Sequence, residues 1–280
     1  MGVILMYEVI KRDKNLANHL IHSYSDMMFA GVVVGNNAGR VWVDSLENPV
    51  SAIVWSDGLQ CFQFMGCEAN QVFYQELKMF IEDEIINFLK EKKLNFFEFS
   101  ADTEEWYPMI NDTLSDRDIM ESWQYVYQHI DNSQVNDKVV MPKPYSLHQI
   151  DESFILSIKN YKIISNPEFL IHYIEQFWGS LNNFLRLGYG YVVINEGEIV
   201  SFAITSFLYN KTFSIGVETL EQHRRKGLAG TLVNNLMRNL YSKGYTIWWD
   251  CMDSNIASQN TAEKNGLVLM HKYKVCWFNI

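Results

Sequence analysis

Residues Val217–Gly230 read VETLEQHRRKGLAG, and this stretch decides how the fold is interpreted. An apolar strand ends near Thr219, a short loop follows, and an amphipathic helix begins roughly at Arg225. Three successive cations, Arg224–Lys226, stand at the helix N-terminus, an end that carries about half a positive charge of its own. These cations disfavour an isolated helix, and an anion bound at this end would account for them.

Small residues in the same loop leave room for such an anion. Gly227, Ala229 and Gly230 keep bulky side chains away, so backbone N–H groups can reach a phosphate. The alternative is a solvated basic helix start whose small residues serve close packing. Taken alone, the segment favours neither interpretation over the other.

The sequence on both sides of this loop predicts an α/β arrangement with a mixed sheet. Antiparallel strands joined by tight turns lead into the loop, and a strand–helix–strand crossover follows it. The expected strands are Tyr189–Asn195, Ile199–Leu208, Thr212–Thr219, Tyr245–Met252 and Leu267–Asn279, with helices at Arg225–Ser242 and Ile256–Lys264.

The first half of the chain is also mixed α and β, but it carries no motif that suggests chemistry. Four strands are expected, at Arg40–Asp44, Val50–Ser56, Gln60–Met65 and Leu94–Ser100, and one amphipathic helix at Val72–Lys92. Pro142 and Pro144 interrupt the polar stretch Gln134–Tyr145, which we expect to be the boundary. The expected domains are therefore residues 1–138, of unknown role, and 143–280.

Charge is divided unevenly along the 280 residues, whose net charge is −10. Residues 1–140 carry 10 Lys and Arg against 22 Asp and Glu, whereas residues 141–280 carry 13 against 11. An acidic chain is a poor partner for nucleic acid, because phosphate binding needs clustered cations. No apolar run approaches the ~20 residues of a membrane span, and no secretory signal is recognisable. We therefore expect a cytoplasmic protein without a nucleic-acid or membrane partner.

The four cysteines, Cys61, Cys67, Cys251 and Cys276, form no CxxC pair and have no histidine at metal-ligand spacing. Each has apolar neighbours in the sequence, so buried thiols are expected. The sequence accordingly predicts no metal site.

The spacing Arg224-x-x-Gly227-x-Ala229 resembles the pyrophosphate loop of the GNAT superfamily of acyl-CoA N-acyltransferases. Downstream, Asn255-x-x-Ser258 and Glu263-Lys264-x-Gly266-Leu267 resemble the second cofactor-contacting helix of that superfamily. The segment lacks the Gly-Lys-Ser/Thr of a P-loop and the three glycines of a dinucleotide fingerprint. The resemblance covers about residues 143–280. Within the superfamily, the motif is most similar to that of the zwittermicin-resistance-type group, which has an N-terminal extension of similar length.

This resemblance implies a GNAT-like fold in the second half and acetyl-CoA as co-substrate, without a metal. The backbone of Val217–Thr219 would pair with the pantetheine arm as an added strand, and the amides of Arg225–Gly230 would hold the pyrophosphate. Asn255 and Ser258 would lie beside the pantetheine and the thiol end. The expected cofactor-binding residues are Val217, Glu218, Thr219, Arg224, Arg225, Lys226, Gly227, Leu228, Ala229, Gly230, Asn255 and Ser258.

Acetyl transfer requires a neutral amine, since an ammonium has no lone pair with which to attack the thioester. Glu218 is the first candidate base, although it could instead be a surface carboxylate paired with Arg224 or Arg225; Glu198 and Glu221 are weaker candidates. A backbone N–H near Thr219 would meet the oxyanion.

The proton donor for the departing thiolate is less clear. Many GNAT enzymes have a tyrosine just before the Glu-Lys-x-Gly stretch, and this chain has Ala262 there. Tyr273 or an ordered water could substitute, or the thiolate could leave with little help.

Three hypotheses follow. The first is an N-acetyltransferase acting on a primary amine of a small, cationic molecule, which the acidic first half would favour electrostatically. The second is a non-catalytic acyl-CoA-binding or sensing protein. In the third, the two halves are paired GNAT-like folds, as in aminoacyl-tRNA-dependent peptidyl transferases, the first half being degenerate and without a loop motif; the net charge of −10 disfavours tRNA as a partner. No residue pattern specifies the oligomeric state.

Overall fold

The computed structural model describes residues 6–10, 15–129, 139–160 and 164–280, and its contacts divide the chain into two compact units. The first unit contains residues up to Gln124 together with Tyr273–Ile280, and the second contains Tyr125–Lys272. The sequence placed a single boundary at residues 138–143 and assigned the C-terminal strand wholly to the second half. Much of that expected linker, up to residue 138, lies outside the described residues.

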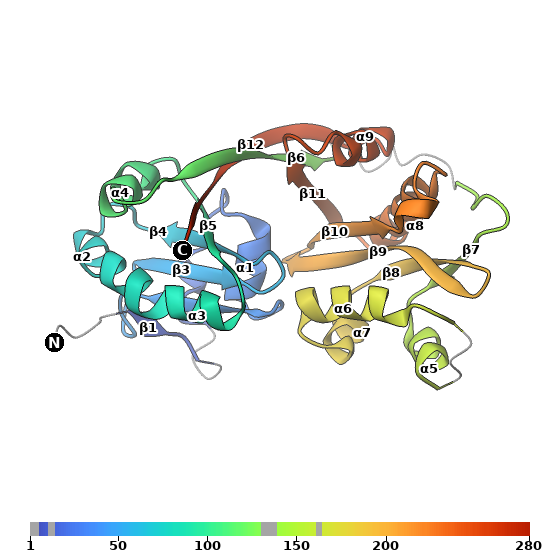
Figure 1. Ribbon diagram of the computed structural model, residues 1–280, viewed down its shortest axis with the longest axis horizontal. Helices are drawn as coiled ribbons and strands as arrows, with labels where there is room; N and C mark the ends of the chain where they lie inside the picture. Colours follow the sequence, from blue (N-terminus) through green and yellow to red (C-terminus); the bar gives the residue numbers. More distant parts are fainter. Residues whose placement is uncertain (1–5, 11–14, 130–138, 161–163) are drawn as a thin grey trace. The chain divides into compact units, whose positions relative to one another are not determined.

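The first unit is built on a mixed sheet with strand order β1-β2-β3-β4-β5-β12 (Figure 1). β4 and β5 are parallel, whereas β1–β2, β2–β3, β3–β4 and β5–β12 are antiparallel. The strands are β1 Tyr7–Glu8, β2 Gly39–Val43, β3 Ser51–Ser56, β4 Cys61–Gly66, β5 Phe96–Ala101, the first part of β6 Met120–Gln128, and the end of β12 Val268–Asn279. The expected strands of the first half are thus present, shifted by one or two residues at their ends.

Helices connect and cover these strands. The expected helix at Val72–Lys92 is present as α2 Gln71–Phe80, the π-helical turn η3 Ile81–Ile85 and α3 Ile86–Glu91, which together form the crossover from β4 to β5. The sequence did not indicate η2 Asn18–Leu20, α1 Met27–Val33 or α4 Trp106–Thr113. η2 and α4 are short, and α1 is buried along its whole length, so none of the three presents a long amphipathic period.

Aromatic side chains dominate the core of the first unit. Phe62 and Phe97 stack with ring centroids 4.8 Å apart, and Phe97 stacks on Phe278 at 5.1 Å. Phe278 reaches this core because the end of β12 pairs with β5, with Phe278 opposite Phe97. The last residues of the chain therefore complete the first unit, which no local sequence pattern indicates.

We expect Phe278→Ala to destabilise the protein strongly. Phe278 is 1% exposed, and truncating a buried phenylalanine typically costs about 3–5 kcal/mol. The free energy of unfolding, measured by urea denaturation, should fall by about that amount. Met270→Ala is the matched control, because Met270 lies on the same strand but is 50% exposed and should change stability by less than about 0.5 kcal/mol. Equal losses in both variants would contradict the role of the C-terminal strand.

The second unit contains the sheet expected around the loop. Its strand order is β11-β10-β9-β8-β7, with β6 beside β11. Neighbouring strands from β7 to β10 are antiparallel, whereas β10 and β11 are parallel. The strands are β7 Ser146–Gln149, β8 Gly190–Asn195, β9 Glu198–Tyr209, β10 Thr212–Thr219 and β11 Thr246–Met252. This confirms the predicted meander followed by a crossover.

Helices cover both faces of this sheet (Figure 1). α6 Pro167–Trp178 and α7 Leu181–Leu187 lie on one face, and α8 Leu228–Ser242 lies on the other. α5 Glu152–Asn160, η5 Glu221–His223 and α9 Ile256–Lys264 complete the unit. Pro167 at the first position begins α6 and Gly179, at φ +71°, ends it, as expected from their backbone preferences. The sheet therefore separates two faces with different helices.

Of the four cysteines, Cys61, Cys251 and Cys276 are buried free thiols, as expected. Cys67 is exposed, and that expectation was wrong for it. Cys67 lies in the loop between β4 and α2, after the apolar residues of the strand have ended. No group of His, Cys, Asp and Glu among the described residues could hold a metal.

Candidate functional site

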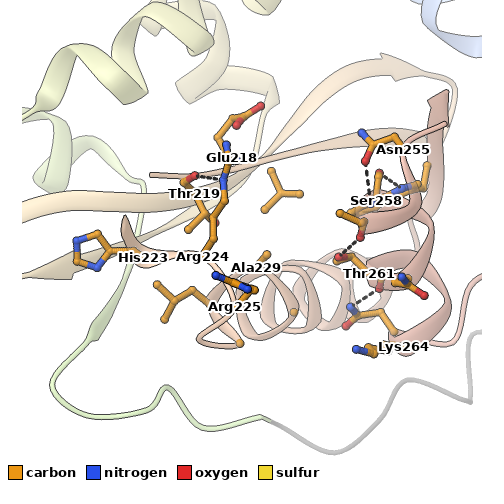
Figure 2. Close-up of a pocket in the computed structure, with 18 residues that line it drawn as sticks. Glu218, Thr219, His223, Arg224, Arg225, Ala229, Asn255, Ser258, Thr261 and Lys264 are labelled. Atoms are coloured by element: carbon orange, nitrogen blue, oxygen red, sulfur yellow. Dashed lines mark hydrogen bonds between the residues drawn. The ribbon is translucent and has the colours of Figure 1, made fainter. Parts of the chain in front are cut away.

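A cavity of about 860 Å³ opens in the second unit beside β10, the start of α8, and α9 (Figure 2). Its lining includes eleven of the twelve expected cofactor-binding residues, all but Lys226. The remaining lining residues, which the sequence analysis did not single out for this role, are His223, Trp249, Ala257, Asn260, Thr261, Lys264 and Asn265.

The cavity begins where β10 and β11 separate. The two strands pair in register over Thr212–Ser214 and Thr246–Trp248, whereas β10 continues to Thr219 paired only with β9 on its other side. The Leu220 N–H donates to the Val200 carbonyl. Because hydrogen bonds alternate along an antiparallel ladder, the backbone N–H and C=O groups of Val217 and Thr219 point away from β9. The Thr219 carbonyl accepts from Arg224 Nε, so an extended chain placed in this opening would meet the N–H and C=O of Val217 and the N–H of Thr219.

The N-terminus of α8 forms a second wall of the cavity. The helix has no side-chain cap, and the Thr231 N–H is the first to bond within it, to the Gly227 carbonyl. The amides of Leu228, Ala229 and Gly230 precede this bond, so they have no acceptor inside the helix. A Cβ built on Gly227 or Gly230 would have nothing within 4 Å. Open space and unpaired amides at a helix N-terminus are suited to an oxyanion.

Left-handed backbone sets where α8 begins. Arg225 has φ +60° and Gly227 has φ +78°, and neither conformation continues a right-handed helix. The helix therefore starts at Leu228, three residues later than the sequence predicted. The two turns before it bring Arg224 and Arg225 to the cavity lining, while Lys226 lies with its ammonium 5.8 Å from the centre of the Tyr145 ring.

The start of α9 forms the opposite wall. Asn255 caps this helix, its Oδ1 accepting the Ser258 N–H at 3.1 Å, and the Ser258 hydroxyl accepts the Trp249 indole N–H at 3.1 Å. Asn255 and Ser258 therefore have structural partners in addition to facing the cavity. Lys264, one helix turn after Asn260 and Thr261, adds a third lining cation to Arg224 and Arg225.

The equivalent crossover in the first unit lacks this cradle. There the loop between β4 and α2 is Cys67–Asn70, and Asn70 caps α2 by accepting the Phe73 N–H. The gap between β4 and β5 is closed as well, since an Asp102 carboxylate oxygen accepts the Gly66 N–H at 3.1 Å. These side chains occupy the backbone donors that remain open in the second unit, which explains physically why only one loop motif was recognisable.

Glu218 lies at the edge of the cavity on β10, and its side chain is directed away from Arg225 and α8 (Figure 2). Its side chain is exposed, but partial loss of hydration raises the pKa of its carboxyl group, and nearby Arg224 opposes that shift. Arg224 donates from Nε to the Thr219 carbonyl at 3.2 Å. A carboxylate with a raised pKa can take a proton near neutral pH.

Three other candidates for proton transfer do not line the cavity. Glu198 begins β9 at its turn with β8, and Glu221 lies in η5. Tyr273 lies on β12 and belongs to the first unit, because the strand passes from one unit to the other between Lys272 and Tyr273. Ala262, at the place of the family's tyrosine, is fully buried in α9.

His223 and Trp249 are lining residues that the sequence did not indicate. The His223 ring nitrogen Nδ1 is 3.0 Å from the Tyr145 hydroxyl, a contact between segments 78 residues apart that no spacing suggests. Trp248 and Trp249 are neighbours on β11, so they point to opposite faces of the sheet; both are buried, and of the two only Trp249 lines the cavity.

Comparison with known proteins agrees with this geometry. The family model for the GNAT acetyltransferases matches residues 18–276. A curated relative, the uncharacterized N-acetyltransferase YdfB of Bacillus subtilis (strain 168), is 23% identical over 237 residues, which cover 85% of this chain and 84% of the relative. The family-model match begins at residue 18, well before the loop. The likeness therefore extends into the first unit, beyond the half of the chain that the sequence motif covers.

Solved structures show the same fold. A GCN5-related N-acetyltransferase-like protein from Streptococcus suis 89/1591 has a TM-score of 0.64 at 20% identity, covering 96% of this chain and 99% of its own. A tandem GNAT protein from the clavulanic acid biosynthesis pathway has a TM-score of 0.62 at 10% identity and covers 98% of both chains. Among the described residues, no helix has the length and apolar character of a membrane span.

Proposed function

This chain belongs to the GNAT acetyltransferase family, and on that premise we propose that it transfers an acetyl group from acetyl-CoA to a primary amine of a small, cationic molecule. The family makes it an acyltransferase; the donor, the acceptor and the residues that act on them are the content of the proposal. The observation that carries it is the cavity between β10, α8 and α9, which combines an open strand edge with an uncapped helix N-terminus.

The two walls of the cavity suit the two parts of acetyl-CoA. The outward-facing amides of Val217 and Thr219 would pair with the amide groups of pantetheine, as one strand pairs with the next. The amides of Leu228–Gly230 would bind the pyrophosphate, and the side chains of Arg224 and Arg225 would add charge-assisted contacts. This use of the loop resolves the unfavourable placement of cations at a helix N-terminus.

Few of this chain's own groups would take part in the reaction. Glu218 would take a proton from the acceptor ammonium, and the amine would attack the thioester carbonyl. Whichever outward-facing N–H of Val217 and Thr219 is not paired with pantetheine would stabilise the developing oxyanion, because both point into the opening. Ala262 cannot donate a proton, so no side chain at that position would protonate the departing thiolate.

Two measurements test the function directly. Calorimetry should detect acetyl-CoA binding, and release of the CoA thiol should rise above background when polyamines, aminoglycosides or amino-polyol antibiotics are added. Binding without turnover on any amine would instead support the second hypothesis, a non-catalytic acyl-CoA-binding or sensing protein. Absence of acetyl-CoA binding would contradict both hypotheses.

A further inference from the structure

A tyrosine hydroxyl touches the backbone of β10 on the face covered by α6. A Cβ built on Gly216 would lie 2.1 Å from Tyr173 Oη and 2.7 Å from Ser206 Oγ. Since real Cβ atoms never approach so closely, this position accepts only glycine while Tyr173 keeps its place. Gly216 directly precedes Val217–Thr219, the part of β10 that lines the cavity. The hydroxyl therefore lies one residue from the strand segment assigned to the cofactor.

Packing fixes the Tyr173 ring in this place. Its centroid is 4.6 Å from that of Phe177, one turn along α6, and 5.0 Å from that of Phe202 on β9. Phe169, one turn earlier, packs on the same Phe202 ring at 4.9 Å. Because Phe202 is fully buried, the tyrosine ring has little freedom to turn and its hydroxyl is held against the strand.

The Glu218 carboxylate comes from the same face of the sheet. Gly216 and Glu218 are two residues apart on β10, so they point to the same side. Phe202, the ring on which Tyr173 packs, is the cross-strand partner of Glu218. Side chains directly opposite on one face lie within about 5.5 Å at Cβ. The sheet thus brings the phenol and the carboxylate together beside the opening between β10 and β11.

The environment keeps this phenol in its neutral form. Burial raises the pKa of Tyr173, the Ser206 hydrogen bond opposes that shift, and the carboxylates of Glu218 and Asp250 add to it. A tyrosine in this environment is a poor proton donor to a leaving group but a good hydrogen-bonding group. Its oxygen can accept an N–H from a bound amine.

We propose that Tyr173 Oη and the Glu218 carboxylate together bind the acceptor amino group, with Tyr173 as a catalytic residue that orients the nitrogen lone pair. This inference rests on the proposed function and adds to it the face of the sheet from which the acceptor approaches. One ammonium proton passes to Glu218, and a second N–H donates to Tyr173 Oη. The remaining lone pair then points at the thioester carbonyl, which reaches this face through the opening between the strands.

The bonds and protons balance in this arrangement. The nitrogen lone pair forms the N–C bond, and the C–S bond breaks with its electron pair on sulfur. The second nitrogen proton goes to sulfur or to water, and Glu218 returns its proton to solvent. The products are the amide and the CoA thiol. Tyr173 changes no bond, so its contribution is to position the nitrogen.

Tyr173→Phe is the direct test, because it removes only the oxygen. With n-butylamine, spermidine and kanamycin as probes, we expect kcat/KM for every accepted amine to fall at least about 30-fold, as for a lost positioning contact, with the Kd for acetyl-CoA unchanged by calorimetry. Tyr191→Phe is the matched control and should keep wild-type kinetics. Tyr191 lies on β8 of the same unit, and the hydroxyl that the change removes accepts an N–H from Asn239 of α8.

A second variant covers the case in which Tyr173→Phe folds poorly. Gly216→Ala displaces the hydroxyl without removing it, and the same selective loss of amine kcat/KM is expected with acetyl-CoA binding retained. Unchanged amine kinetics in a folded Tyr173→Phe, with the wild type active, would overturn this inference and leave the proposed function standing. A wild type that binds no acetyl-CoA, or acetylates no amine, would overturn the proposed function and this inference with it.

Discussion

Gly227→Glu is expected to abolish acetyl-CoA binding while leaving the fold intact. The position is exposed, and a side chain there meets no atom within 4 Å, so the folded state loses only the left-handed backbone preference, about 1–2 kcal/mol. A carboxylate beside the pyrophosphate adds repulsion of about 4 kcal/mol for charges 4 Å apart near a protein surface, part of which salt screens. We expect the calorimetric Kd to rise at least about 100-fold.

Gly227→Ala separates the charge from the backbone strain. Alanine has the same left-handed penalty but no charge and only one carbon in the open space, so its Kd for acetyl-CoA should stay within about tenfold of the wild type. Both variants should keep the wild-type circular dichroism spectrum. If Gly227→Glu binds acetyl-CoA as tightly as Gly227→Ala, the start of α8 is not the anion cradle.

The sequence predicted the second unit well from β8 onward, because the signals there are local, but it did not indicate β7 or α5–α7. Turn residues between apolar strands marked β8–β10, and the small residues after Arg224 marked the start of a helix, as the structure confirms. The start of α8 was placed three residues early because a helical hydrophobic period does not reveal backbone handedness. Only the φ values of Arg225 and Gly227 show that these residues form turns.

What the sequence could not predict depends on contacts between distant segments. The pairing of Phe278 with Phe97 joins residues far apart in the chain, and no spacing rule relates them. The contact between Tyr173 and Gly216 is similar, because a helix residue meets a strand glycine only after α6 has packed on the sheet. Tyr273 was considered as a proton donor from its chain position alone, and the structure assigns it to the other unit.

The first unit illustrates a second limit. Its crossover β4–α2–β5 has the same strand–helix–strand form as β10–α8–β11, but Asn70 and Asp102 fill the donor positions that the second unit leaves open. The family match over residues 18–276 therefore detects a likeness that the loop pattern could not.

Glu218→Gln is expected to reduce kcat at neutral pH by at least about 100-fold, the usual range for loss of a general base. The pH dependence is the stronger test. Glu218 accepts a proton only when ionised, and partial loss of hydration raises its pKa, so kcat/KM should increase with pH through a midpoint above the ordinary value for glutamate. Glutamine does not titrate, and the acidic limb should be absent from the profile of Glu218→Gln.

Arg224→Gln should shift the acidic limb of the pH profile, whereas Glu218→Gln should remove it. Arg224 lowers the pKa of Glu218, so its removal should move the acidic limb to higher pH when acetyl-CoA is saturating. A limb that persists unchanged in Glu218→Gln would remove Glu218 as the base. It would favour instead the simple interpretation, a surface carboxylate near Arg224 that takes no part in proton transfer.

Stability distinguishes these interpretations independently of activity. Because the folded-state pKa of Glu218 is raised, its protonated form favours folding, and this contribution is full below the unfolded pKa and lost as pH rises through the folded pKa. At neutral pH the ionised side chain therefore does not stabilise the fold, and Glu218→Gln should unfold at the same or a higher temperature than the wild type. A carboxylate retained for an ion pair with Arg224 would give the reverse, a lower Tm at neutral pH. We expect loss of activity without loss of stability, the combination typical of a residue kept for chemistry.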